Sequence, residues 1–475
     1  MRGFNRRSMS SLALGASMLA LATIPGTALA QDASAPVADN AVSEQAGDDI
    51  VVTGIRASLE QSAQIKRNSQ GVVDAISAED IGKFPDTNLA ESLQRITGVS
   101  IDRSNGEGST VTVRGFGPEY NLVTLNGRQM PTSSLGDGAS APATRSFDFA
   151  NLASEGISGV EVYKTGRASV PSGGIGSSIN IKTPRPLDRP GMRGSIAAKA
   201  VYDVSRNLSD PITPEVSGIF STTFGEDRFG ILLSGSYQRR KASVNTASIG
   251  FRDGFLGDPA ANAARENTWG ELNPAGVNIT NRPTGTDVYE IPQSASYELV
   301  DIDRERINGQ LVLQAKLSDT LTATADFTYS RNRVEARSSS TGIWFNFGDV
   351  SSAWADGPSA APIFYAENFG PGVLVNPTTS TGKDLSYSGA LTANQTENKS
   401  FGGTLQWDAP GGVTVILDGH HSTAESTPSN KYGTSTSIGT AIFGVASQRI
   451  NFENDLPILS YTMSPGIDPL NAGLV

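Results

Sequence analysis

The sequence predicts an α+β domain followed by antiparallel strands of a transmembrane β-barrel. Residues 55–190 mix short helical and strand-like patterns, and from about Gly194 onward apolar and polar residues alternate with a period of two. Short and long connections alternate between these segments, as in barrels whose loops are long on one side of a membrane. These three observations together predict the fold class.

The composition excludes several classes of protein. The 475 residues carry 37 basic and 48 acidic side chains, a net charge of −11, and they include no cysteine. The two histidines, His420 and His421, are adjacent and fall on opposite faces of a predicted strand, so they cannot jointly bind a metal. We therefore expect no disulfides, no metal site, no cofactor and no nucleic-acid partner. The sequence also lacks the residue spacing of a catalytic site, and we predict that the chain is not an enzyme.

The first 30 residues have the pattern of a secretory signal peptide. Arg2, Arg6 and Arg7 precede a short apolar run at 10–22, and Ala28 and Ala30 supply the small residues of a cleavage site after Ala30. An uncleaved N-terminal anchor is the alternative. No later segment contains 18 consecutive apolar residues, so an exported chain would enter a membrane only as β-structure.

Residues 31–48 are rich in Ala, Asp, Gln and Ser, and we expect them to be a disordered linker. The segment 49–54, with the sequence DIVVTG, interrupts this composition with three β-forming residues. It is either the first strand of the next domain or a tethered strand that adds to the sheet of a partner.

Residues 55–190 predict a compact α+β domain. Ser77 is expected to begin a short helix, and a clearer helix follows Asn88, with Leu89, Leu93 and Ile96 at helical spacing. Strands are expected at 99–101, 110–113, 122–125, 160–164 and 179–182, with a hairpin turn at 126–127. The glycine-rich turn at 172–178 lacks the ending of a phosphate-binding loop.

Seven alternating strands are expected near 194–204, 215–224, 228–240, 299–317, 320–336, 399–408 and 412–423. Three junctions are short, at 225–227, 318–319 and 409–411, whereas those at about 205–214, 241–298 and 337–398 are long. This alternation is typical of an outer-membrane barrel. A soluble β-sandwich is the alternative.

Four segments resemble TonB-dependent outer-membrane receptors. Residues 49–54 look like a TonB box, and 88–101 are similar to the first helix and strand of the plug domain. Residues 113–117 with 123–128 resemble the central plug hairpin, and 160–164 with 173–181 resemble the closing plug motif. The segment 81–86 is similar to the branch found in Caulobacter- and Xanthomonas-type bacteria, where oligosaccharide uptake is common.

The resemblance implies a domain order of signal peptide (1–30), linker (31–48), TonB box (49–54), plug (55–190) and barrel (191–475). It also implies that TonB binds Asp49, Ile50, Val51, Val52 and Thr53 and drives import through the outer membrane. The plug-motif residues would be Arg114, Gly115, Gly117, Asn126, Gly127, Arg128, Gly174 and Gly176.

The transported nutrient is expected to be an oligosaccharide. A siderophore or other iron complex is the alternative, as is a truncated, non-transporting binding protein. The other expected partners are outer-membrane lipid and the barrel-assembly machinery.

Aromatic side chains in the predicted long loops suit stacking on a ligand, although packing within the loops explains them equally well. These residues are Trp269, Trp344, Phe345, Phe347 and Trp354. Arg114 and Arg128 either pair with acidic groups of the barrel lumen or remain solvated.

The length departs from the family. A plugged barrel of this kind needs about 22 strands, whereas only 285 residues follow Pro190. The last residues also lack a terminal strand ending in an aromatic residue. We therefore expect an incomplete barrel of about 7–8 strands and interpret the chain as an N-terminal fragment or a truncated product.

Overall fold

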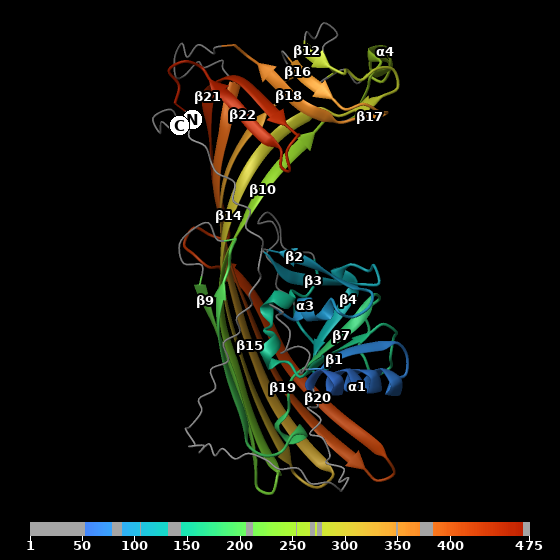
Figure 1. Ribbon diagram of the computed structural model, residues 1–475. Coiled ribbons are helices and arrows are strands. Elements are labelled where there is room, and N and C mark those ends of the chain that lie inside the picture. Colours follow the sequence, from blue (N-terminus) through green and yellow to red (C-terminus); the bar gives the residue numbers. More distant parts are fainter. Residues whose placement is uncertain are drawn as a thin grey trace, which may run out of the picture. The chain divides into compact units, whose positions relative to one another are not determined.

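The computed structural model describes residues 53–77, 88–104, 106–131, 144–205, 212–252, 254–266, 271–272, 278–347, 350–370 and 383–468 (Figure 1). The predicted signal peptide, the linker, Asp49 to Val52 of the predicted TonB box and Trp269 lie outside these residues.

The first domain combines a five-stranded sheet, with strand order β1-β6-β7-β4-β5, and a separate β2–β3 hairpin. Its elements are α1 (Thr53–Asn68), β1 (Val73–Ser77), α3 (Leu89–Leu93), β2 (Val99–Ser104), β3 (Glu107–Val113), η1 (Pro118–Tyr120), β4 (Asn121–Leu125), β5 (Arg128–Gln129), η2 (Phe149–Asn151), η3 (Ser154–Gly156), β6 (Gly159–Tyr163), β7 (Ser177–Lys182) and η4 (Pro186–Asp188). The described helices, including α4 (Pro259–Ala264), do not combine the length and hydrophobicity that a membrane-crossing helix requires.

The helix predicted after Asn88 is present as α3. Asn88 caps it by accepting a hydrogen bond from the Glu91 backbone N–H at 3.3 Å. Leu89 and Leu93 are fully buried and join β3, β4, β6 and β7 in one apolar core. The short helix predicted to begin at Ser77 would occupy residues outside those that the structure describes, and Ser77 itself is the last residue of β1.

The start of the domain also differs from the prediction. Thr53 and Gly54, assigned above to an extended box, are the first residues of α1. Helix α1 lies beside β1, the edge strand of the five-stranded sheet (Figure 1). The Lys66 ammonium pairs with the Asp74 carboxylate of β1 at 2.8 Å.

The second part of the chain forms a twelve-stranded sheet. Its long strands are β8 (Arg193–Tyr202), β9 (Ile212–Phe224), β10 (Phe229–Phe251), β14 (Pro292–Lys316), β15 (Leu321–Trp344), β19 (Lys383–Ala409), β20 (Val413–Pro428), β21 (Ser435–Asn451) and β22 (Ile458–Met463). The shorter β12 (Asn278–Thr280), β16 (Val350–Trp354) and β18 (Pro362–Asn368) extend it, while β11 (Phe255–Leu256), β13 (Val288–Tyr289) and β17 (Ser359–Ala360) form a separate small sheet.

The expectation of an incomplete barrel of seven or eight strands is wrong. All seven predicted strands exist, but the sheet holds twelve, and several strands are much longer than predicted. Strands β10, β14, β15 and β19 have 23 to 27 residues each and extend into both ends of the two segments that we expected to be long loops, 241–298 and 337–398. The three short turns are where the sequence places them, at 225–228, 317–320 and 410–412.

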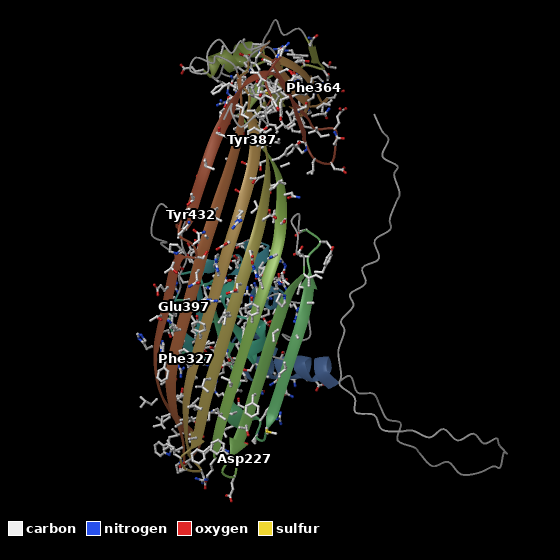
Figure 2. All side chains as sticks on the ribbon, turned by 90° about the vertical axis from the view of Figure 1, so that its left-hand side faces the viewer. Asp227, Phe327, Phe364, Tyr387, Glu397 and Tyr432 are labelled. Carbon is white, nitrogen blue, oxygen red and sulfur yellow. The ribbon has the colours of Figure 1, made fainter. Side chains whose placement is uncertain are left out.

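The face of the large sheet opposite the first domain has three zones. The first is an apolar band that includes Leu233, Leu313, Phe327, Phe401, Trp407 and Leu417, all exposed. The second is a charged belt that includes Arg239, Asp303, Glu305, Arg331, Arg333, Glu335, Glu397 and Lys399. Figure 2 shows this order along the strands, from Asp227 in the β9–β10 turn through Phe327 and Glu397 to Tyr387 and Phe364.

The third zone is a second apolar core, which the chain covers with its own segments. Ala295, Ile343 and Leu385 contribute from the long strands, and Trp354 and Tyr365 contribute from β16 and β18. All five are buried. Of the two apolar zones on this face, the core is covered by protein within the described residues, whereas the apolar band is exposed.

Candidate functional site: the contacts between the first domain and the large sheet

Arg128, the first residue of β5, forms an ionic cluster that we call the Arg128 clamp. Its guanidinium donates to both carboxylate oxygens of Asp326 on β15 at 2.7 and 2.8 Å. It also donates to Asp418 on β20 at 2.8 to 3.1 Å and to the Thr404 hydroxyl on β19 at 2.9 Å. The Arg128 side chain is only 4% exposed. Its positive charge is therefore removed from water and depends on these carboxylates as partners.

The hairpin turn places this guanidinium. Asn126 and Gly127 both have positive φ, 53° and 84°, as the predicted two-residue turn requires. The Gly127 N–H donates to Asn180 Oδ1 on β7 at 2.8 Å, and the Asn126 amide accepts from the Thr183 N–H at 3.0 Å. The turn is thus tied to the neighbouring strand, and Arg128 leaves the turn toward the large sheet.

Gly402 on β19 makes room for the clamp. A Cβ at this position would lie 1.7 Å from Arg128 Nη1 and 2.2 Å from Cζ, far inside van der Waals contact. Any larger residue here would therefore displace the guanidinium from its two carboxylates.

Glu107 on β3 forms a second cluster, the Glu107 clamp, in which the charges are reversed. Its carboxylate pairs with Arg304 at 2.5 Å and with Arg306 at 2.6 Å, both from β14, and all three side chains are at most 5% exposed. Burial alone would raise the pKa of Glu107, but the charges of Arg306 and Arg304 outweigh it and lower that pKa from its usual 4.5 to about 2. The carboxylate is therefore charged at all physiological pH values.

The remaining predicted motif residues act within the first domain. Arg114 is exposed and donates to the Gly176 carbonyl at 2.6 Å. Gly174 and Gly176 allow close backbone packing, because a Cβ would lie 2.2 Å from the Ser177 carbonyl oxygen and 2.7 Å from Phe116 Cβ, respectively. Gly115 has a φ of +80°, and Gly117 precedes η1. The Arg114 hydrogen bond and the close contacts of Gly174 and Gly176 lie within the first domain.

The predicted aromatic ligand residues fall into two groups. Phe345 and Trp354 are buried in the second apolar core, and the Trp354 indole N–H donates to Ser352 Oγ at 3.0 Å. Trp344 is 47% exposed. Trp344 and Phe347 lie beside the Arg252 guanidinium, whose Cζ is 5.8 and 5.0 Å from the two ring centroids. Of the predicted set, these two therefore share one cation.

The two histidines follow the strand alternation. His420 pairs across the ladder with Gly402, on the face toward the first domain, and His421 pairs with Phe401, on the opposite face. Among the described residues, no group of three or more His, Cys, Asp or Glu side chains is arranged to hold a metal ion.

Five charged residues of the two clamps were not predicted as site residues: Glu107, Arg304, Arg306, Asp326 and Asp418. Each lies in a strand pattern and no local motif marks it, and Arg304 and Arg306 fall within a run of charged residues at 301–306. The available signal was that Asp326 and Arg304 occupy positions of the alternating strands that should face the lumen, where a charge requires a partner.

Comparison with known proteins identifies the first domain. Residues 65–178 match the TonB-dependent Receptor Plug Domain. The chain is 29% identical over 234 residues to the ferric enterobactin receptor PirA of Pseudomonas aeruginosa, an alignment that covers 45% of this chain and 30% of that receptor. The chain thus spans less than a third of the length of this curated relative.

Solved structures of receptors also match. A mutant of the ferric enterobactin receptor PfeA from Pseudomonas aeruginosa aligns with 84% of this chain and 60% of its own, at 12% identity and a TM-score of 0.37. The siderophore receptor PirA from Acinetobacter baumannii aligns with 87% of this chain and 89% of its own, at 12% identity and a TM-score of 0.30.

Proposed function

We propose that this chain, which contains a TonB-dependent receptor plug domain, acts in an outer-membrane receptor that imports a ferric siderophore. The observation that carries the proposal is the pair of ionic clamps, which attach that plug to a large antiparallel sheet at two separate places. A plug held by buried ion pairs blocks a pore at rest, and it can be released as a unit when force is applied.

The apolar band supports a membrane location. On β15 it extends over residues 321–329, nine residues in all, which is close to the roughly 9–11 that a tilted strand needs to cross the hydrocarbon layer. Tyr329 lies at its edge and donates to Glu397 at 2.9 Å, where an amphipathic ring is expected at a membrane interface. The export signal predicted at residues 1–30 and a dependence on the barrel-assembly machinery belong to the same proposal.

The charged belt and the covered core lie beyond this band, so each long strand extends well past the proposed membrane. In this orientation the second core forms a folded cap on the outer surface of the cell. Trp344, which is exposed, and Phe347, which is half-buried, then provide aromatic rings beside the Arg252 cation, and this combination suits an aromatic, negatively charged ligand such as a catecholate iron complex.

The siderophore replaces the oligosaccharide as the proposed substrate. One curated relative, 29% identical over 234 residues, is described as a ferric enterobactin receptor. The name of that relative does not mention oligosaccharides, so it lends no support to the predicted similarity to the oligosaccharide-importing branch.

TonB is the proposed energy source, and Asp49, Ile50, Val51, Val52 and Thr53 are its proposed binding segment. Because this segment ends at Thr53, the first residue of α1, a pull on it would act on the plug through α1 and the neighbouring edge strand β1. A strand that adds to the sheet of a partner binds through backbone hydrogen bonds, so the loss of one N–H donor weakens the binding whatever the side chains are.

The test is proline at Val51. We expect Val51→Pro to abolish energy-dependent uptake of ferric enterobactin while surface binding of that complex remains, because proline removes a backbone donor from the proposed strand. Ala41→Pro, in the predicted linker, is the matched control and should transport normally. Normal uptake by Val51→Pro would refute the assignment of the box.

A further inference from the structure

A cavity of about 220 Å³ lies between the plug and one part of the large sheet. Segment 152–157 of the plug, which includes η3, forms one side. Small residues of β8, β9 and β10 form most of the other, together with polar residues of β14. The residues that matter here are Ala153 and Gly156 from the plug, and Ser217, Ser234, Ser236 and Gln310 from the sheet.

Polar atoms in this cavity have no protein partner. Gln310 is only 8% exposed, and its Oε1 forms no hydrogen bond in the described structure. The Asn308 amide beside it lacks a partner at both Nδ2 and Oδ1. A buried polar group left without a partner costs about 1–3 kcal/mol. Water or a polar ligand in the cavity removes this cost, and a volume of this size holds several water molecules.

The two clamps adjoin this cavity but do not line it. The Arg128 clamp attaches the plug to β15, β19 and β20, and the Glu107 clamp attaches it to Arg304 and Arg306 of β14. The cavity lining contains no charged residue. At the cavity, therefore, no ion pair joins the plug to the sheet, and β8, β9 and β10 present glycine, alanine and serine there.

We propose that the imported complex passes between the plug segment 152–157 and strands β8 to β10, and that Gln310 and Asn308 line this route. The proposal rests on the import function proposed above. An uncharged polar lining suits a complex rich in carbonyl and hydroxyl oxygens, since the lining can donate and accept hydrogen bonds without binding the complex as tightly as an ion pair would.

The test uses single cysteines, because the chain contains none of its own. Ser236→Cys places a thiol in the cavity. Ser422→Cys is the matched control, since Ser422 lies on the same face of the sheet near the Arg128 clamp, with its Oγ 2.9 Å from Ser400 Oγ. Each variant is modified in whole cells with either a methyl-sized or a fluorescein-sized thiol reagent, and uptake of ferric enterobactin is measured.

We expect the large adduct at position 236 to lower uptake at least tenfold while surface binding is retained, and the methyl-sized adduct to have little effect. The large adduct at position 422 should leave uptake within twofold of the unmodified variant. Equal losses at both positions, or no loss at position 236, would overturn the proposed route.

A second readout does not depend on the substrate. The rate at which the large reagent modifies Ser236→Cys should rise several-fold in energised cells relative to cells without TonB, and the rate for Ser422→Cys should not. If labelling responds in this way but no siderophore is imported, the route stands and the proposed substrate fails. If import proceeds and labelling at position 236 is insensitive to TonB, the route is wrong.

Discussion

Gly402 controls the Arg128 clamp, and its substitution gives the sharpest prediction at the scale of single residues. In Gly402→Ala the new Cβ would overlap the guanidinium, so Arg128 must leave Asp326 and Asp418. Removing one partner of a buried ion pair costs about 3–5 kcal/mol. We expect a loss of that order in the free energy of unfolding of the purified protein, measured by denaturant titration in detergent.

The adjacent Gly403 is the matched control, because a Cβ there meets only the Thr324 carbonyl oxygen, at 4.0 Å. Gly403→Ala should change stability by less than about 1 kcal/mol. In Arg128→Ala the clamp is already absent, so adding Gly402→Ala should cost little more. If the two losses simply add, Gly402 does not act through Arg128.

The Glu107 clamp predicts a pH dependence. The pKa of Glu107 is depressed from 4.5 to about 2 in the folded chain, so the clamp contributes its full stability above pH 4.5 and loses it as the pH falls toward 2. Glu107→Gln removes this titration and leaves two buried arginines without their carboxylate. We expect the variant to be less stable at pH 7 and to show a flatter stability profile between pH 4.5 and 2. A profile parallel to that of the unmodified protein would contradict the assignment.

At this scale the sequence predicted only part of the site. The turn at Asn126 and Gly127 was predictable from a local pattern, and it fixes where Arg128 begins. Its partners were not predictable, because Asp326 and Asp418 are 198 and 290 residues away and their approach depends on the register of β15, β19 and β20.

At the scale of structural elements, the zones along the long strands predict where a strand tolerates a new charged side chain and where it does not. Phe327 lies in the apolar band of β15 and Ser339 lies on the same face of that strand, beyond the belt. Phe327→Lys should destabilise the membrane-inserted protein by about 2–4 kcal/mol if it faces hydrocarbon. Ser339→Lys is the matched control and should be nearly neutral. Equal effects, measured by unfolding from lipid vesicles, would exclude the proposed membrane boundary.

The belt also explains why the strands were predicted too short. In the band, polar residues face the plug and apolar ones face outward, so the period of two is plain. In the second half of β15, residues 331–340 (RNRVEARSSS), the outward face is polar and the other face mixes polar residues with Val334 and Ala336. The alternation of apolar outward and polar inward residues therefore ends although the strand continues. Only the pairing with β14 and β19 shows that these residues are strand.

The cap separates structural aromatic residues from candidate ligand residues. Trp354 is buried in the second core, so Trp354→Ala should cost about 3–5 kcal/mol and lower the temperature at which the cap unfolds. Trp344→Ala should leave the unfolding temperature nearly unchanged and weaken binding of ferric enterobactin, because Trp344 is exposed beside Arg252. A Trp344→Ala variant with unchanged affinity would remove that residue from the proposed ligand site.

In the molecule as a whole, the clamps, the apolar band and the cap are separate features, and each depends on a different kind of interaction. The core of the plug and the core of the cap are held by apolar packing, whereas the plug is attached to the large sheet through two buried ionic clusters. The hydrogen bonds in these clusters have narrow limits of distance and angle, so a small displacement of the plug breaks them and leaves both cores intact. The architecture thus permits the plug to move without unfolding the sheet.

The most direct test of this account is uptake of radioiron-labelled ferric enterobactin by cells that express the protein, with and without a functional TonB. We predict accumulation that requires TonB and binding at the cell surface that does not. Equal accumulation with and without TonB, or TonB-dependent accumulation of oligosaccharides and not of ferric siderophores, would contradict the proposed function.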